Sequence, residues 1–459
     1  MPKTIILGKS KVSLEDILRI ARDHARVSIN TSALTRCERS FRYLISSGAH
    51  KTIYGFNTGF GPMASIKIPD DKRIELQYNL IRSHAVGQGS PLPAEMVRAI
   101  LAVRLNSLLL GYSGIPRELP QKIAALLNND ILPIIPEHGS VGASGDLVQL
   151  AHIALALIGE GSVLYKGKKI KTSDALKRAR VAPLTIRSRE GLAIMNGTSA
   201  MTGIAALNII KAENLLRQSI EISARLYEIT NSYDDALAAK LHAARPHTGQ
   251  SIIAAEIRKL LHNSKHLRKR YTSGSKENDR VQEVYSIRCA PQILGPIYDA
   301  IRYARSVIEI EINSATDNPI ISGNKILHGG NFHGDYVAFE MDKLKIAIAK
   351  LSLLSERRIN FLLNDRINGI LPPFLNTGRL GLDLGFQGMQ FVATSTAAEN
   401  QMLSNPMSIH SIPSNRDNQD VVSMGANSAL QTYKVISNAR IVVKIEELIT
   451  EKASKILKI

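Results

Sequence analysis

The chain has 459 residues, which is long enough for a large hydrophobic core and for two or three domains. Hydrophobic residues make up 44% and charged residues 21%, which excludes intrinsic disorder for most of the chain. The 58 basic and 40 acidic residues give a net charge of +18, which permits a nucleic-acid or membrane-surface partner. No nucleic-acid-binding motif accompanies this charge, so we interpret it as a general surface bias and expect neither partner.

Other features of the composition narrow the class of protein. Aromatic residues make up 5% and tryptophan is absent, so the core must be aliphatic, which suits long packed helices. The two cysteines, Cys37 and Cys289, exclude a disulfide framework and favour a reducing, cytoplasmic compartment. No window of ~18 apolar residues predicts a membrane span, and the N-terminal apolar run is too short for a signal peptide.

A helical period dominates the chain. Ser13 and Asp16 form a capping box, which predicts a helix that runs to about His24. Several further patterns exceed the usual ~11–12 residues and predict a bundle of long helices; the patterns cover residues 73–86, 95–111, 118–129, 146–159, 206–230, 250–262, 293–316, 338–364, 385–403 and 427–457. The best strand signal is a short hairpin over 162–170. The basic stretch 264–280 is interpreted as a solvated loop, with a lid or an anion-binding patch as alternatives.

Two glycine-rich loops, 54–62 and 139–146, carry candidate chemistry. In the second, Ser144 lies among small residues just before a predicted helix, where free N–H groups favour negative charge. Small residues let the nitrogen of Gly145 approach the carbonyl of Ala143. Ser144 can then lose water and leave an electrophilic methylidene on a five-membered ring made from the chain. Taken alone, these residues fit a simple helix-capping loop equally well.

The wider context of this loop is distinctive. It is similar to the cofactor-forming segment of the aromatic amino acid ammonia-lyases and aminomutases, and the similarity extends over almost the whole chain in the right order. The matching segments are Gly139-Ser140-Val141-Gly142-Ala143-Ser144-Gly145-Asp146-Leu147, Tyr54-Gly55-Phe56-Asn57-Thr58-Gly59-Phe60-Gly61, Ser83-His84-Ala85, Asn196-Gly197-Thr198, residues 282–288, Asp317-Asn318-Pro319, Gly329-Gly330-Asn331-Phe332-His333, Ser355-Glu356-Arg357-Arg358 and Asn418-Gln419-Asp420.

The resemblance implies a chemical role for both loops. Ala143, Ser144 and Gly145 would cyclise to 4-methylideneimidazol-5-one, which captures the amine of the substrate and turns it into a good leaving group. Tyr54 matches the catalytic tyrosine that removes the β-proton. Because a phenol ordinarily titrates near ~10, Tyr54 needs a lowered pKa or a helping partner to act as the base.

The same resemblance assigns further site residues. Arg288 matches the residue that holds the substrate carboxylate, a task for which a planar bidentate donor is suited. Asn196 and Gln282 match positions that bind the cofactor ring oxygen or orient the substrate. Tyr285 is expected to support proton transfer, and Phe332 to line the substrate site.

Two positions bear on the choice of substrate. The Ser83-His84 pair resembles that of bacterial histidine and tyrosine lyases. An imidazole at His84 can hydrogen-bond a phenol or a substrate imidazole. Gln419 stands where histidine lyases usually carry Glu. The combination favours L-tyrosine, giving trans-4-coumarate and ammonia. The alternatives are a histidine ammonia-lyase that gives urocanate, and a tyrosine or phenylalanine 2,3-aminomutase.

The resemblance also implies a fold and an assembly. We expect a mostly α-helical protein with a long-helix central bundle of the fumarase/aspartase-like ammonia-lyase type and a smaller, loop-rich N-terminal active-site region. The expected regions are 1–200, with both loops, and 201–459, with the bundle, apparently shortened at its C-terminus relative to bacterial relatives. The shortened C-terminus is expected to expose apolar surface or weaken assembly. A homotetramer with shared active sites is implied, with no metal and no dissociable cofactor; His328 and His333 are interpreted as loop histidines.

Overall fold

The computed structural model describes residues 4–48, 50–269 and 282–459, so most of the basic stretch at 264–280 lies outside the described residues. The chain divides into two compact units. The first unit comprises Met1–Asn208, Arg305–Met341 and Pro406–Leu430, and the second comprises Ile209–Ala304, Asp342–Asn405 and Gln431–Ile459. Each unit is assembled from three separate stretches of chain, whereas the predicted regions 1–200 and 201–459 are contiguous; that division stays a prediction.

The helices predicted at 73–86, 95–111, 118–129 and 146–159 are present in the first unit, whereas those at Thr31–Gly48, Thr172–Ala179 and Glu190–Met195 were not predicted. The Ser13–Asp16 capping box is confirmed, since Oγ of Ser13 accepts from the Asp16 amide at 3.1 Å. In this unit α1 packs against α4, and α6 packs against α3 and α8. The helices are α1 (Leu14–Ala21), α2 (Thr31–Gly48), α3 (Arg73–His84), α4 (Ala94–Leu109), α5 (Glu118–Asn128), α6 (Leu147–Leu157), α7 (Thr172–Ala179) and α8 (Glu190–Met195), with short 3-10 turns at Gly61–Met63 and Asp70–Lys72.

Among the described residues, the strands are short and lie in the first unit. The predicted hairpin is confirmed as β6 (Ser162–Tyr165) and β7 (Lys168–Lys171), in which Tyr165 pairs with Lys168, and β4 (Ile131–Pro133) joins its edge. The remaining pairs each involve strands of three or four residues: β1 (Ile5–Leu7) with β2 (Val27–Ile29), β3 (Gln88–Pro91) with β5 (Pro136–His138), and β8 (Ile320–Ser322) with β9 (Lys325–Leu327).

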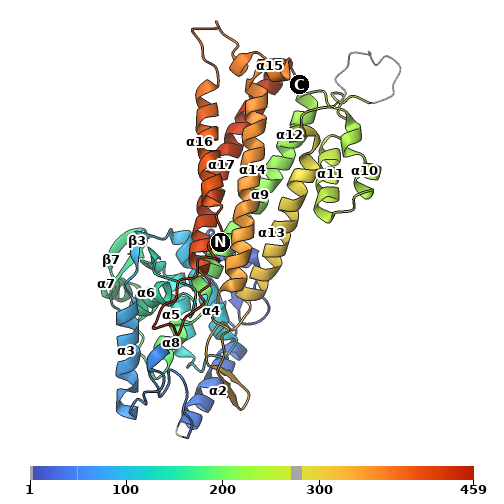
Figure 1. Ribbon diagram of the computed structural model, residues 1–459. Helices are drawn as coiled ribbons and strands as arrows, with labels where there is room; N and C mark the ends of the chain where they lie inside the picture. Colours follow the sequence, from blue (N-terminus) through green and yellow to red (C-terminus); the bar gives the residue numbers. More distant parts are fainter. Residues whose placement is uncertain (1–3, 49, 270–281) are drawn as a thin grey trace. The chain divides into compact units, whose positions relative to one another are not determined.

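Long helices form the second unit, as the sequence predicted (Figure 1). Four helices (α9, α13, α14 and α17) have one part in each unit. The elements are α9 (Ser199–Ile229), α10 (Ala239–Ala243), α11 (Thr248–Leu260), α12 (Tyr285–Arg288), α13 (Ala290–Ile312), α14 (Asp335–Leu363), α15 (Asp365–Asn368), α16 (Gln387–Leu403) and α17 (Gly425–Leu457), with 3-10 turns at Asp234–Leu237 and Pro373–Leu375. Among the described residues, no helix is both long and apolar enough to cross a membrane.

A buried ion pair ties the long helices of the second unit together. Arg358 on α14 contacts Glu446 on α17 at 3.4 Å, and neither side chain is exposed to solvent. The guanidinium also donates to Oγ of Ser223 on α9 at 2.7 Å and to the carbonyl of Ser286 on α12 at 2.8 Å. One arginine therefore joins four helices and holds the backbone of α12.

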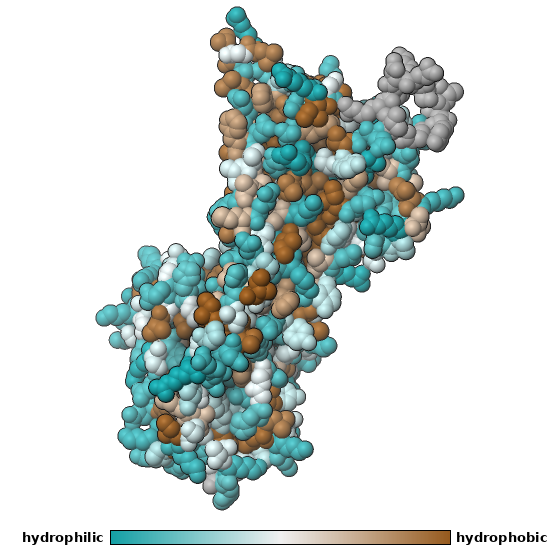
Figure 2. Space-filling view, in the orientation of Figure 1, coloured by the Kyte–Doolittle hydropathy of each residue, from teal (hydrophilic) through white to brown (hydrophobic). Residues whose placement is uncertain are grey.

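Helix α16 buries only a narrow face. Its buried residues are Ala393, Ala397 and Asn400, whereas Phe391 and Met402 are 64% and 66% exposed. Figure 2 shows apolar side chains at the surface over the long helices of the second unit. Exposed apolar surface on such a scale is typical of a face that binds another protein.

Candidate active site

A cavity of about 490 Å³ lies within the first unit. The sequence-predicted residues Tyr54, His84, Ser144, Asn196, Phe332 and Gln419 all line it. The rest of the lining includes apolar side chains, among them Met63, Leu76, Leu80 and Leu192, and amides from Asn79, Asn318, Asn415 and Asn418. Segments that lie far apart in the sequence therefore converge on one cavity.

The glycine-rich loop at 139–146 is held against a second tight segment of backbone. Gly145 has φ +66° and Gly197 has φ +153°, conformations that L side chains rarely adopt. A Cβ at Gly145 would lie 2.1 Å from the carbonyl oxygen of Gly197, so no larger residue fits there. The Asp146 amide donates to the same carbonyl at 2.8 Å. Glycine at both positions allows the close approach of the two segments.

Asp146 anchors the end of this loop. It is fully buried, and its carboxylate accepts from the amides of Ala200 and Met201 in the first turn of α9 and from Oγ of Ser140, all at 2.8 Å. Burial raises the pKa of Asp146 to about 6, although these hydrogen bonds oppose the shift. The loop is thereby attached to the start of a long helix.

The atoms that cyclisation would join are available for it. Among the described residues, neither the N–H of Gly145 nor the carbonyl oxygen of Ala143 takes part in a protein hydrogen bond. Oγ of Ser144 accepts from Nε2 of Gln419 at 3.0 Å, and Oε1 of Gln419 accepts from Oγ of Ser414 at 3.0 Å. The Gln419 amide thus faces the serine of the cofactor loop.

Tyr54 lies on a loop that is attached at two points. Its hydroxyl accepts from the Gly61 amide at 3.0 Å, and its ring meets that of Phe60 edge to face at 6.1 Å. Its backbone N–H donates to Nε2 of His328 at 3.2 Å. Burial raises the pKa of Tyr54 above its ordinary value, although the Gly61 hydrogen bond and the charge of Arg189 oppose the shift. The phenolate is therefore disfavoured when no ligand is bound.

His84 ends α3 with one ring nitrogen already engaged. Nδ1 lies 3.0 Å from the carbonyl oxygen of Leu80 and 3.0 Å from Oγ of Ser83. A carbonyl only accepts, so Nδ1 carries the proton, and in the neutral ring Nε2 keeps its lone pair. Burial lowers the pKa of His84, so the neutral form dominates near pH 7.

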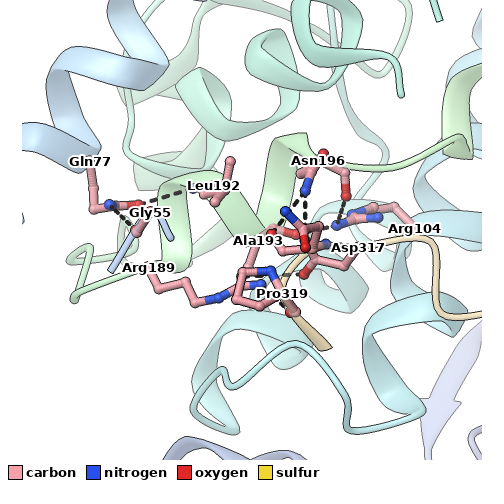
Figure 3. A network of polar contacts seen from close by, with 10 residues as sticks. Gly55, Gln77, Arg104, Arg189, Leu192, Ala193, Asn196, Asp317 and Pro319 are labelled. Atoms are coloured by element: carbon pink, nitrogen blue, oxygen red, sulfur yellow. Dashed lines mark hydrogen bonds and ion pairs between the residues drawn. The ribbon is translucent and has the colours of Figure 1, made fainter. Parts of the chain in front are cut away.

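Sequence reasoning missed a buried network behind the cavity, which Figure 3 shows. Arg104 and Arg189 are both fully buried, and they contact the backbone of Asn196 and the carboxylate of Asp317, respectively. A signal was present for Arg104, because α4 is apolar along most of its length and an arginine there needs buried partners. Asp317 was noted only as part of a motif.

Three predicted site residues lie elsewhere in the chain. Gln282, Tyr285 and Arg288 belong to the second unit and do not line the cavity. Tyr285 is 70% exposed and Gln282 is also exposed. Arg288 is half-buried; its Nε donates to the carbonyl of Glu283 at 3.3 Å, and its guanidinium lies 5.1 Å from the centre of the Tyr285 ring. Their predicted roles stay predictions.

The histidines at 328 and 333 make separate contacts. His328 accepts from Tyr54, as described above, and His333 lies 3.1 Å from the carbonyl oxygen of Val421. Across the residues that the structure describes, no three His, Cys, Asp or Glu side chains form a metal-binding group.

The profile of the family described as aromatic amino acid lyase matches residues 12–458. The chain belongs to this family. This aromatic amino acid lyase is accordingly a carbon–nitrogen lyase, and the resemblance inferred from its motifs is confirmed.

Similar proteins carry several names. The lyase is 42% identical to the histidine ammonia-lyase of Geobacillus thermodenitrificans over 446 residues, which cover 96% of this chain and 87% of that one. It is 43% identical to the tyrosine 2,3-aminomutase of Chondromyces crocatus over 451 residues, covering 95% and 85%. The structure matches the tyrosine aminomutase of Streptomyces globisporus with a TM-score of 0.93 at 37% identity, covering 99% and 89% of the chains. The predicted fold class is confirmed by these matches.

Proposed function

We propose that the protein removes ammonia non-oxidatively from an aromatic L-amino acid, and that L-tyrosine, giving trans-4-coumarate, is its substrate. The observation that carries the proposal is the cavity that Ser144, Tyr54 and His84 line together. The lining of this cavity combines a serine on a tight glycine loop, a phenol, and a hydrogen-bond acceptor for the ring of the substrate.

The residues of the loop fit a 4-methylideneimidazol-5-one. The nitrogen of Gly145 would attack the carbonyl carbon of Ala143, one water would leave on ring closure, and Ser144 would lose its hydroxyl as a second water. When formed, this group supplies an electrophile for the amino group of the substrate. Two observations support the fit: the Gly145 N–H and the Ala143 carbonyl make no protein hydrogen bond among the described residues, and glycine is required at 145 by close approach.

Tyr54 would accept the β-proton of the substrate. Its raised pKa means that the phenolate needs help, and the positive charge of Arg189 favours the phenolate. The Gly61 amide donates to the hydroxyl oxygen and stabilises the phenolate more than the phenol, because a hydrogen bond to a charged acceptor is stronger. We expect deprotonation to be favoured at alkaline pH.

His84 would select for a ring that donates a hydrogen bond. With Nδ1 directed at Leu80, the neutral ring offers Nε2 as an acceptor. Tyrosine can donate its phenol hydroxyl, and phenylalanine has nothing to donate and would leave Nε2 unpaired. Among the described residues that line the cavity there is no carboxylate to pair with an imidazolium, which favours tyrosine over charged histidine.

We also propose a homotetramer in which Gln282, Tyr285 and Arg288 complete the active site of another subunit. The exposure of Tyr285 and Gln282 and the exposed apolar face of α16 support this assembly. In the assembled site Arg288 would hold the carboxylate of the substrate. A reducing, cytoplasmic location is proposed with it, supported by the presence of only two cysteines.

Two other activities have support from similar proteins. The relative from Geobacillus thermodenitrificans is named a histidine ammonia-lyase, and that from Chondromyces crocatus a tyrosine 2,3-aminomutase. A histidine lyase would release urocanate. An aminomutase would return the amine to the β-carbon and release a β-amino acid.

The test is to incubate the protein separately with L-tyrosine, L-phenylalanine and L-histidine. Ultraviolet absorbance would follow coumarate, cinnamate and urocanate, and chromatography would detect β-amino acids. We expect the fastest reaction with tyrosine and coumarate as the main product. Faster release of urocanate, or β-tyrosine as the main product, would contradict the proposed substrate or reaction, respectively.

A further inference from the structure

Gln77 joins two segments of backbone behind the cavity. It lies on α3, is completely buried and does not itself line the cavity. Its Nε2 donates to the carbonyl of Gly55 at 3.2 Å, and its Oε1 accepts from the amide of Leu192 at 3.0 Å (Figure 3). A carbonyl only accepts and an N–H only donates, so the side-chain amide has a single orientation that satisfies both.

Gly55, the residue after Tyr54, is held on both sides. Its N–H donates to Oγ1 of Thr58 at 3.1 Å, and its carbonyl accepts from Gln77. Its φ of +67° is one that L side chains rarely adopt, and a Cβ there would lie 2.3 Å from Cδ2 of Leu192. The backbone beside Tyr54 is therefore fixed in direction and lies directly against α8.

Helix α8 is a firm support for this loop. All six of its residues are buried. It packs against α6, whose first residue, Leu147, closely follows the loop that contains Ser144. Leu192 of α8 and Leu147 of α6 both line the cavity. Through Gln77, the loop of Tyr54 is thus attached to the same packed helices as the loop of Ser144.

We propose that Gln77 is a positioning residue that holds the backbone beside Tyr54 against α8 and so keeps the phenol hydroxyl in place for proton transfer. The role of Tyr54 as the base rests on the proposed function. The attachment of the loop by Gln77 rests on the contacts alone, so it can be tested without a substrate.

Two substitutions separate the two hydrogen bonds. Gln77→Met has a similar length and makes neither. Gln77→Glu makes both while its carboxyl is neutral, because the hydroxyl donates to Gly55 and the other oxygen accepts from Leu192. The ionised carboxylate still accepts from Leu192, but it turns an acceptor towards the carbonyl of Gly55. Since burial favours the neutral form, this loss should occur above the ordinary glutamate pKa of about 4.3.

The first experiment measures kcat and KM of the full-length chain between about pH 6 and about pH 10, a range in which a fully buried glutamate can ionise. The substrate is whichever of L-tyrosine, L-phenylalanine and L-histidine the unsubstituted protein converts fastest, so a wrong choice among them does not affect the result. Each kcat is divided by that of the unsubstituted protein at the same pH, which removes the titration of groups that both proteins share.

We expect Gln77→Met to lower kcat about 10- to 100-fold at every pH, since a small misplacement of a reacting group can cost about 10²-fold. Gln77→Glu should match the unsubstituted protein within about threefold at the acidic end and lose as much as Gln77→Met at the alkaline end. KM should change less than kcat in both variants, because Gln77 does not line the cavity.

The matched control is Gln149→Glu. Gln149 is a buried glutamine on α6 that does not line the cavity, and its Nε2 also donates to a backbone carbonyl, that of Glu137, at 3.3 Å. An ionised carboxylate at this position meets the same kind of acceptor but no part of the Tyr54 loop. Its kcat ratio should not depend on pH.

A kcat ratio for Gln77→Glu that does not change with pH would overturn the proposal, as would an unchanged kcat in Gln77→Met. Equal alkaline losses in Gln77→Glu and Gln149→Glu would overturn it as well, because any buried carboxylate would then suffice. If Gln77→Met does not fold, Gln77→Glu still decides the matter, since its loss of kcat should be reversed when the same sample is returned to acidic pH.

Hydrogen–deuterium exchange of the ligand-free protein tests the attachment independently of activity. The amides of residues 54–61 should exchange faster in Gln77→Met than in the unsubstituted protein at the same pH. In Gln77→Glu they should exchange faster only at alkaline pH, whereas the amides of α8 stay protected, because the carboxylate keeps its hydrogen bond to Leu192. Unchanged exchange of the loop would overturn the proposal whatever the protein acts on. If Tyr54→Phe keeps full activity, the proposed base is wrong, and the exchange data still decide whether Gln77 holds the loop.

Discussion

The two units place their predicted site residues in opposite environments. In the first, Ser144, Tyr54 and Asn196 line a cavity, and buried arginines hold the segments behind it. In the second, Tyr285 is 70% exposed, and the buried part is the Arg358–Glu446 pair that holds the backbone of α12. Residues of the first unit alone thus line the cavity, and the second unit presents Tyr285 at the surface of the short helix α12.

Arg189 and Arg358 are both fully buried, but they hold different parts of the structure. Arg189 lies behind residues that line the cavity, so changes near it should alter the chemistry and the choice of ligand. Arg358 lies among helices and touches α12 only through a backbone carbonyl. Changes there should alter stability first.

Ser144→Ala should abolish activity. The side chain can no longer lose water, so no electrophile forms and the rate should fall by more than about a thousandfold, equivalent to about 4 kcal/mol of barrier. Steady-state kinetics and the ultraviolet absorbance of the cofactor would check it. Ser173→Ala, at an exposed position, should change neither. An active Ser144→Ala protein would refute the proposed chemistry.

Tyr54→Phe should lower kcat by about 10²- to 10⁴-fold, which is typical for loss of a general base, and leave the cofactor absorbance intact. Because burial raises the pKa of Tyr54, the phenolate forms as the pH rises. The kcat/KM of the unsubstituted protein should therefore keep increasing up to and above pH 10, and Tyr54→Phe should lose this increase.

The control for this variant is Tyr78→Phe. The hydroxyl of Tyr78 accepts from the Ile186 amide at 3.3 Å, and Tyr78 does not line the cavity. It should retain the pH profile. If kcat/KM of Tyr54→Phe rises with pH as in the unsubstituted protein, Tyr54 is not the base.

Arg358→Met should cost about 3–5 kcal/mol in the free energy of unfolding, because it leaves Glu446 buried without its partner. Burial already raises the pKa of Glu446. The loss of unfolding free energy in the variant should therefore become smaller as the pH falls and Glu446 takes up a proton, and larger as the pH rises. Denaturant unfolding at several pH values measures it, with Arg225→Met as control, because Arg225 and its partner Glu451 are both exposed. A pH-independent loss would argue against the buried charge as its cause.

The long helices and the local signals of this chain were readable from the sequence. Apolar spacing predicted α14 and α17, the Ser13–Asp16 box predicted the start of α1, and the matching loops predicted residues that the structure brings to one cavity. These features depend on residues that are close together in the sequence or on a sequence motif.

Features that depend on distant partners were missed. Strands β1 and β2 have three residues each and exist because Ile5 pairs with Val27. The partners of Arg189 lie more than a hundred residues away in the chain. Neither a periodicity nor a spacing indicates such contacts, because they form only when the unit folds.

His84→Phe should shift preference from tyrosine to phenylalanine by about 10- to 100-fold, since the acceptor for the phenol hydroxyl is lost. The KM for tyrosine should also rise as the pH falls below the ordinary histidine value of 6.5, because burial lowers the pKa of His84 and protonation removes the acceptor. The KM of the variant for phenylalanine should lack this rise. His138→Phe, with an exposed side chain, is the control; an unchanged preference in His84→Phe would show that His84 does not contact the ring.

The most direct test of the central claim is the mass of the purified chain. If the first unit makes its own electrophile from Ala143, Ser144 and Gly145, the intact protein should be lighter than its sequence by two water molecules, and proteolysis should locate the loss to the peptide that contains these residues. Ser144→Ala should lack the full loss. A chain whose mass equals that of its sequence would contradict the account.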